Sequence, residues 1–209
     1  MKNILIADDH PVVRKGLKDV LLDEFPNAEF GEAQDAEEAL RKIKEKKWDI
    51  LILDINMPGR SGLDVLYQLK DENNKTPVLV LSMHLEEQIA VRILKLGGFG
   101  YICKESPETE LIKAIHHILG GRKYITPSLA EQLATQLDND HTKAPHELLS
   151  DREYQTLLLI ALGKTVSQIA EQLSLGVPTI STYRARILEK MGMKTNADLV
   201  SYAIHNKLI

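Results

Sequence analysis

The sequence predicts an α/β domain built on a doubly wound parallel sheet, followed by a separate domain made only of helices. In the first part of the chain, five short apolar runs alternate with stretches whose apolar residues recur at helical spacing. This alternation is typical of a parallel sheet covered by helices. In the last part, every apolar stripe has helical spacing. With 209 residues, 44% of them hydrophobic, the chain can bury a core in each domain.

The first domain is expected to span residues 1–122, with its five strands in the order 2-1-3-4-5. The strands are predicted at residues 4–7, 29–33, 50–53, 77–82 and 100–103. The helices are marked by apolar stripes within residues 13–25, 36–43, 61–71, 89–96 and 111–119. Glycine pairs follow the last two helices and are expected to end them.

A linker is expected to join the two domains. Residues 138–147 are polar and lack periodic apolar residues, so we place a flexible linker within residues 123–147, with a possible short helix at 129–137. The second domain is expected to span residues 148–209. Four stripes indicate its four helices: Leu157, Leu158 and Ala161; Val166, Ile169, Ala170 and Leu173; Ile180, Tyr183, Ile187 and Met191; Leu199, Ala203 and Ile204.

Composition restricts the classes of function. The net charge of −4 argues against a protein that is basic throughout, but residues 176–209 carry five Lys or Arg and two Asp or Glu. Any nucleic-acid contact is therefore expected near the C-terminus. No apolar run approaches membrane-spanning length, and the first residues turn acidic at Asp8, so we expect a soluble, intracellular protein. Cys103 is the only cysteine and is expected to act as a small hydrophobe.

Asp54 is the strongest candidate for a reactive group. It follows the continuous aliphatic run of residues 50–53, and Met57, Pro58 and Gly59 make the next segment a loop. A carboxylate at the C-terminal end of a parallel strand lies where open α/β sheets bind ligands. The alternative is that Asp54 caps the next helix. That helix is expected to begin near Ser61, too far along the chain for such a cap.

Polar side chains also stand at the ends of other predicted strands, namely Asp8 and Asp9, Ser82, and Lys104. These ends converge in a parallel sheet, so the site is expected to hold three carboxylates, one hydroxyl and one ammonium group. Clustered carboxylates repel one another unless a cation shares them, and oxygen ligands select a hard ion such as Mg²⁺. The metal and Lys104 could then neutralise a phosphoryl group on Asp54.

This pattern resembles the receiver domains of two-component response regulators over about residues 1–122. The resemblance is carried by Asp8, Asp9, Asp54, Met57, Pro58, Gly59, Ser82, Tyr101 and Lys104. It implies that Asp54 accepts a phosphoryl group from a sensor histidine kinase. It further implies that Asp9, Asp54 and the backbone carbonyl of Asn56 hold Mg²⁺, while Asp8 acts mainly through water.

The same resemblance implies a switch and a tuned lifetime. Ser82 would move toward the phosphoryl oxygens, and Tyr101 would rotate inward with it. Asn56 and His84 stand where relatives tune how long the phosphoryl group survives. Gly98 stands where alanine is more usual, which is expected to loosen the end of the fourth helix.

A rival interpretation is a haloacid-dehalogenase-type phosphatase, which also forms an aspartyl-phosphate. Those enzymes need a second aspartate two residues after the nucleophile as acid and base. Asn56 stands there instead, which counts against the phosphatase.

Residues 165–191 predict a helix-turn-helix. A break at 174–176 separates two helical stripes, and Pro178 fits the first turn of the second helix. The candidate DNA contacts on that helix are Thr179, Ser181, Thr182, Arg184 and Arg186, whose hydroxyl and guanidinium groups can reach phosphates or base edges. The alternative is a solvated face on a module that docks a protein.

Residues 148–209 resemble the LuxR-type output domains of NarL/FixJ regulators. The resemblance is carried by residues 149–153, 160–163, 168–170, 179–180 and 187–191. The run from Ile180 to Arg186 is most similar to the BvgA and EvgA branch. Many relatives carry histidine at the position of Tyr183 and basic residues at the positions of Ser181 and Ala185. The resemblance therefore does not identify which residues read the bases.

The sequence therefore predicts a response regulator that binds double-stranded promoter DNA, as a dimer on two half-sites when phosphorylated. Phosphorylation would reorganise the face that carries Ser82, Tyr101 and the fourth helix, and so release or dimerise the second domain. The resemblance to LuxR-type domains implies that the last helix, residues 197–205, forms the dimer contact of the output domain; the alternative is that it simply packs in the core. The alternative is a signalling adaptor whose helical domain binds protein.

Overall fold

The computed structural model describes residues 1–83, 87–138, 144–173, 175–206 and 208–209. The chain divides into two compact units, Met1–Gln132 and Leu133–Ile209. His84 and residues 139–143 of the expected linker lie outside the described residues. None of the helices in the described ranges has the length and apolar character needed to cross a membrane.

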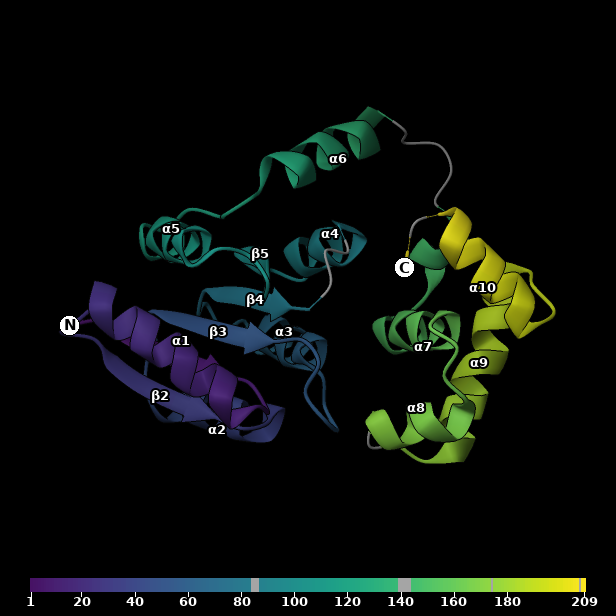
Figure 1. The fold of residues 1–209 in the computed structure, drawn as a ribbon, viewed down its shortest axis with the longest axis horizontal. Coiled ribbons are helices and arrows are strands. Elements are labelled where there is room, and N and C mark those ends of the chain that lie inside the picture. The colour runs from purple at the N-terminus through teal and green to yellow at the C-terminus, as the bar shows by residue number, and fades with distance from the viewer. Residues whose placement is uncertain (84–86, 139–143, 174, 207) are drawn as a thin grey trace. The chain divides into compact units, whose positions relative to one another are not determined.

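Five parallel strands form one sheet in the first unit, in the order β2-β1-β3-β4-β5 (Figure 1). Their bounds are β1 Asn3–Ala7, β2 Glu29–Ala33, β3 Ile50–Asp54, β4 Val78–Ser82 and β5 Gly100–Cys103. Every residue of β3 and β4 is buried, which explains their uninterrupted aliphatic sequences. The predicted fold class and strand order are confirmed.

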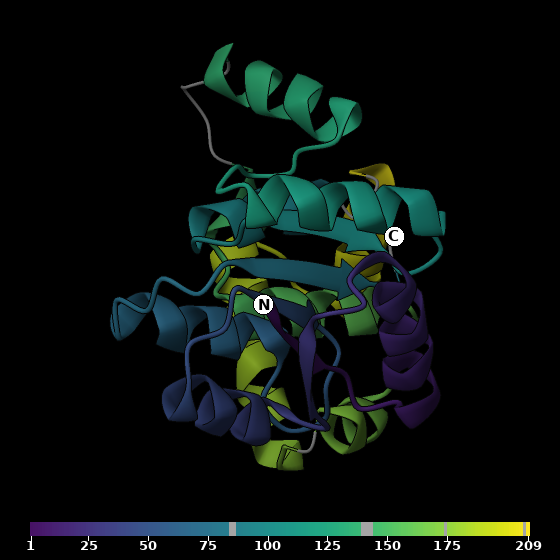
Figure 2. The ribbon, with the colours of Figure 1, turned by 90° about the vertical axis from the view of Figure 1, so that its left-hand side faces the viewer.

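Helices cover both faces of this sheet, and α1 and α2 lie on opposite sides of the strands (Figure 2). α1 (Pro11–Glu24) and α5 (Glu108–Leu119) pack on one face. The core between them and the sheet comprises Ile4, Ile6, Leu21, Ile50, Ile52, Leu79, Leu81, Ile102, Leu111, Ala114, Ile115 and Ile118. The other face is covered by α2 (Ala36–Glu45), α3 (Gly62–Asp71) and α4 (Glu87–Lys95). Alternate strand residues thus face two different cores.

The chain continues to pack on this unit after α5. Tyr124 forms an isolated parallel bridge with Gly100, and its backbone N–H donates to the carbonyl of Phe99 at 2.7 Å. α6 (Pro127–Asp138) follows, with the hydroxyl of Thr126 accepting from the backbone N–H of Leu129 at 3.4 Å. Leu129 and Tyr124 are both buried, so the edge of β5 is partly covered by the segment that leaves the sheet.

Helices make up the second unit, and no strand occurs in its described part. A 3-10 turn, η1 (Pro145–Leu148), precedes α7 (Asp151–Ala161), α8 (Val166–Gln172), α9 (Val177–Met191) and α10 (Asn196–His205). Capping boxes begin α7, α8 and α10, so side chains satisfy two backbone N–H groups at the start of each of these helices. The fully buried side chains of the core include Leu157, Ile169, Ile180, Ile187 and Leu199.

Candidate functional site

The predicted site residues meet at one edge of the first unit's sheet. Asp54 is the last residue of β3, and Asp8 and Asp9 follow β1 directly. Lys104 follows β5. The carboxyl ends of all five strands lie at this edge because the strands are parallel. Asp8 and Asp54 are 1% and 2% exposed, so these carboxylates are almost completely removed from water.

Lys104 is the counter-charge of the buried carboxylates. Its Nζ lies 2.9 Å from Oδ2 of Asp54 and 2.6 Å from Oδ2 of Asp8. Burial raises the pKa of Asp54 above its usual value, and the hydrogen bond from Lys104 opposes this only in part. Burial acts to lower the pKa of Lys104, but hydrogen bonds to Asp54 and Asp8 outweigh burial and raise it. The ammonium group therefore stays charged in the site.

Asp8 is held in place by all four of its polar groups. Its backbone N–H donates to the carbonyl of Ala33 at 3.1 Å, and its carbonyl accepts from Nη1 of Arg14 at 2.6 Å. Its Oδ1 accepts from the backbone N–H of His10 at 2.8 Å, and its Oδ2 accepts from Lys104. One carboxylate of the site is therefore fixed before any ligand arrives.

Arg14 supports the site and was not predicted from the sequence. It lies on α1, and its Nε is 3.5 Å from Oε2 of Glu32, which is also paired with Lys18 at 3.1 Å. Two sequence features alone could have indicated this role of Arg14: its position one helical turn after His10, and an acidic residue near the end of a neighbouring strand.

The group of Asp8, Asp9, His10 and Asp54 fits a divalent cation. Each side chain offers one ligand atom, and these atoms lie within 4.8 Å of one another. Oδ1 of Asp9 is buried and accepts no hydrogen bond from the described part of the chain, although Nδ1 of His10 lies 2.8 Å from it. Lys104 alone cannot balance three carboxylates, so the donor set and its charge suit a hard cation.

The loop after β3 separates Asp54 from the next helix. The cap of α3 is Ser61, which forms a capping box with Asp64, so Asp54 does not cap this helix. The backbone N–H of Asn56 donates to Oδ1 of Asp54 at 3.2 Å, while that of Gly62 donates to the carbonyl of Ile55 at 3.1 Å. The exposed Asn56 side chain stands at the mouth of the site.

Ser82 and Tyr101 lie on neighbouring strands beside the carboxylates. Ser82 ends β4 and is 1% exposed, and its carbonyl accepts from the backbone N–H of Lys104 at 2.7 Å. Tyr101 is buried in β5. Tyr101 pairs with Val80, and Ser82 pairs with Cys103, so Ser82 and Tyr101 point to the same side of the sheet. A cavity of about 420 Å³ lies beside Tyr101, lined also by Leu129 of α6.

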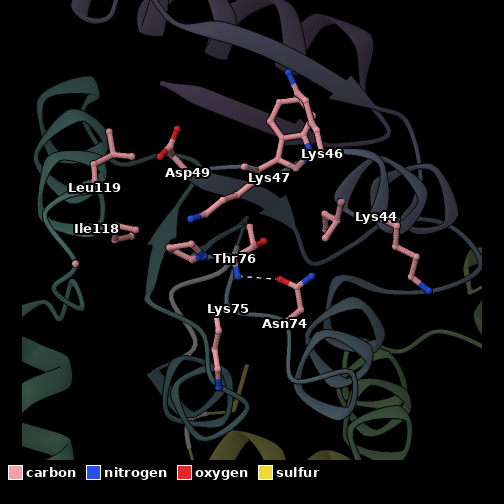
Figure 3. Close-up of a pocket in the computed structure, with 13 residues that line it drawn as sticks. Lys44, Lys46, Lys47, Asp49, Asn74, Lys75, Thr76, Ile118 and Leu119 are labelled. Carbon is pink, nitrogen blue, oxygen red and sulfur yellow. Dashed lines mark hydrogen bonds between the residues drawn. The ribbon is translucent and has the colours of Figure 1, made fainter. Parts of the chain in front are cut away.

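A second cavity, of about 680 Å³, opens at the opposite edge of the sheet (Figure 3). Four lysines line it: Lys44, Lys46, Lys47 and Lys75. Their side chains point in different directions (Figure 3). Two of them form ion pairs, Lys44 with Glu72 and Lys46 with Glu29. The charges do not converge on one point, in contrast to those around Asp54.

In the second unit, α8 and α9 form the predicted helix-turn-helix, although Ser174 of the turn lies outside the described residues. Ser181, Thr182 and Arg186 are exposed on α9, and Thr179 is half-buried. Arg184 is partly engaged within the protein, because its Nε donates to Oδ1 of Asn196 at 2.5 Å.

The sequence of each unit matches a family model. Residues 4–116 match the response regulator receiver domain, which is more than half of the chain. Residues 147–203 match the bacterial regulatory proteins of the luxR family. The chain belongs to the response regulators. Its two units are a receiver domain and a LuxR-type DNA-binding domain, which supports a transcription regulator and favours this interpretation over the phosphatase and the protein-binding adaptor.

Curated response regulators match over the full chain. Response regulator UvrY of Escherichia coli K12 is 31% identical over 209 residues, covering 100% of this chain and 96% of UvrY. Oxygen regulatory protein NreC of Staphylococcus aureus is 35% identical, covering 99% of this chain and 98% of NreC. The predicted NarL/FixJ membership is therefore confirmed at the level of the family, while the BvgA and EvgA branch stays a prediction.

Solved response regulators share both units. One structure of RcsB from Salmonella typhimurium aligns with a TM-score of 0.69 and 26% identity, covering 97% of each chain. RcsB from Salmonella enterica serovar Typhimurium, bound to promoter rprA in the presence of the phosphomimetic BeF3-, aligns with a TM-score of 0.66, 26% identity, and coverage of 97% and 98%.

Proposed function

We propose that Asp54 accepts a phosphoryl group from a sensor histidine kinase and that this reaction controls binding to promoter DNA. One observation carries the proposal. Asp54 is a buried carboxylate at a strand end, 2.9 Å from Lys104 and within a cluster of side chains that fits a divalent cation. Ion pairs with a purely structural role are common. Here, however, the buried carboxylates outnumber the nearby cations, and this arrangement lowers the stability of the fold unless a further cation binds to them.

The reaction follows from the charges at this edge. A carboxylate oxygen of Asp54 attacks phosphorus, and the bond from phosphorus to the kinase imidazole nitrogen breaks, with its electron pair leaving on that nitrogen. Lys104 neutralises part of the charge on the phosphoryl oxygens, and Ser82 donates a hydrogen bond to them. Asp9, Asp54 and the backbone carbonyl of Asn56 would hold Mg²⁺, which would supply further positive charge to the phosphoryl oxygens.

The switch is proposed to run through Ser82 and Tyr101. Movement of Ser82 toward the phosphoryl group changes the space beside Tyr101, since both side chains face the same side of the sheet. The cavity lined by Tyr101 and Leu129 gives the ring room to change its rotamer. The movement therefore reaches the start of α6, which leads out of the receiver.

DNA binding is proposed to use α9 as the recognition helix. The proposed contacts are the exposed Ser181, Thr182 and Arg186, together with Thr179 and the two Nη atoms of Arg184. RcsB has been solved with DNA and with a promoter, which supports double-stranded promoter DNA as the partner. RcsB has also been solved as two dimers bound to two parallel DNAs, which supports a dimer on DNA. We propose that phosphorylation promotes this dimer and that α10 forms its contact. The run 180–186 supports placing this helix with the BvgA and EvgA branch.

The domain limits are proposed as 1–122 for the receiver, 123–147 for the linker and 148–209 for the output domain. The regulator is proposed to act in the cytoplasm, where a bacterial promoter and the kinase domain of a sensor are both accessible.

Intact-protein mass spectrometry tests the phosphoryl transfer. The full chain is incubated with acetyl phosphate, with and without Mg²⁺, alongside Asp54→Asn and a control, Asp71→Asn, at the exposed end of α3. We expect one phosphoryl adduct that requires Mg²⁺, is retained in Asp71→Asn and is lost in Asp54→Asn. An adduct that persists in Asp54→Asn would overturn the assignment.

A further inference from the structure

His10 lies within the group of carboxylates and has a nitrogen atom facing them. Its Nδ1 is 2.8 Å from Oδ1 of Asp9 and 3.3 Å from Oδ1 of Asp8. The side chain is nevertheless 66% exposed. The imidazole therefore reaches the site from the solvent side, with one edge toward the carboxylates.

The backbone holds this residue in place. The N–H of His10 donates to Oδ1 of Asp8 at 2.8 Å, and its carbonyl accepts from the N–H of Arg14 at 3.1 Å. His10 is the N-cap residue of α1, yet its side chain makes no capping hydrogen bond, and Pro11 begins the helix. The ring is thus directed at the carboxylates and takes no part in capping the helix.

The spacing allows one ion to be reached by all four side chains. Their ligand atoms lie within 4.8 Å of one another. Bonds of about 2.0–2.3 Å from a divalent ion to nitrogen or oxygen place opposite donors roughly 4.0–4.6 Å apart. Neighbouring donors on such an ion lie about 3 Å apart, and Nδ1 of His10 is 2.8 Å from Oδ1 of Asp9 and 3.3 Å from Oδ1 of Asp8, so it stands where a neighbouring ligand atom would.

We propose that His10 is a nitrogen ligand of the metal site and makes it favour Mn²⁺ or Co²⁺ over Mg²⁺. The inference rests on the proposed use of this site by a divalent cation. Imidazole suits borderline transition metals, whereas Mg²⁺ prefers oxygen ligands and retains its waters. Mg²⁺ would leave His10 unbound, while Mn²⁺ would exchange one water for Nδ1. The ring proton then resides on Nε2, which the exposure of the side chain leaves open to solvent.

Electron spin echo envelope modulation of Mn²⁺ bound to the full chain tests this directly. We expect nitrogen modulation that changes when the histidines carry ¹⁵N and disappears in His10→Gln. The matched control is His205→Gln, because His205 is exposed at the end of α10 in the other unit. Histidine labelling keeps the signal distinct from Nζ of Lys104, which also lies near Asp54.

Calorimetric titration supplies the second readout. His10→Gln is expected to lower the affinity for Mn²⁺ by about ten-fold or more, a loss typical of altered metal shells, and to leave the affinity for Mg²⁺ within about two-fold. Absent histidine modulation in the wild type, or equal losses for both ions, would overturn the role of His10. Retention of the Mg²⁺-dependent phosphoryl adduct in His10→Gln would show that the proposed function survives such a failure. If neither ion binds the wild type, the proposed metal site fails as well.

Discussion

Gly62 lies directly against the backbone that carries Asp54, so Gly62→Ala is expected to damage both stability and phosphorylation. A Cβ atom at position 62 would lie 2.4 Å from the carbonyl oxygen of Asp54 and 2.9 Å from Cα of Ile55, whereas ordinary contacts begin at 3.4 Å. Both neighbours are backbone atoms, so no side chain can rotate away. The loop must move by about an ångström, which is comparable to overpacking changes that cost roughly 1–3 kcal/mol.

Urea unfolding of the full chain measures this cost. Trp48 is the only tryptophan and is buried in the first unit, so its fluorescence follows the unfolding of the receiver alone. With an m-value of about 2 kcal/mol/M, the midpoint of Gly62→Ala is expected to fall by roughly 0.5–1.5 M. The rate of phosphoryl adduct formation with acetyl phosphate is expected to fall as well, since the carbonyl that moves belongs to the acceptor residue.

Gly16→Ala is the matched control, because a Cβ there meets nothing within 4 Å and the residue lies inside α1. That change is expected to stabilise the receiver by about 0.5–1 kcal/mol. A Gly62→Ala variant as stable as the wild type would refute the steric reasoning.

Three further predictions concern charge. Burial acts to raise the pKa of Glu153, but hydrogen bonds from Lys190 and Ser150 outweigh burial and lower this pKa. The ionised Glu153 therefore stabilises the second unit fully only at a pH above the pKa of the unfolded-state carboxyl, about 4.3. The free energy of unfolding followed by circular dichroism should fall below that pH as the folded group is protonated, and less so in Glu153→Gln. Mg²⁺ at about 100 times its Kd should raise the free energy of unfolding of the receiver by about 2.7 kcal/mol, as measured by Trp48 fluorescence. The gain should be much smaller in Asp54→Asn, and an equal gain in both proteins would contradict the proposed metal site. Arg186→Ala should weaken binding to duplex DNA and reduce the salt slope in fluorescence anisotropy by about one, while an unchanged slope would place Arg186 off the DNA.

Local sequence patterns sufficed to predict the strands and the place of Asp54. Continuous aliphatic residues in β3 and β4 indicate burial on both faces, and the residue that follows such a strand stands at a fixed edge of the sheet. The convergence of Asp8 and Lys104 on Asp54 follows from the parallel order of the strands alone. Their ion-pair distances do not, because they depend on rotamers.

Contacts between residues of different helices and strands could not be predicted from the sequence. Arg14 was missed because its link to Asp8 requires the orientation of α1 over the end of β1. Arg184 was predicted to contact DNA, but its hydrogen bond to Asn196 was not predicted, because it depends on where α10 begins. The bridge between Tyr124 and Gly100 joins residues on either side of α5, and nothing in the local sequence marks it.

The central claim is that phosphorylation of Asp54 controls DNA binding by the second unit. Its most direct test is fluorescence anisotropy with a duplex selected from a random-sequence library by the full chain treated with acetyl phosphate and Mg²⁺. The affinity of the wild type for this duplex is expected to rise on treatment, whereas the affinity of Asp54→Asn is expected to stay at the untreated level. Equal affinities of the treated and untreated wild type, under conditions where mass spectrometry detects the phosphoryl adduct, would contradict the account.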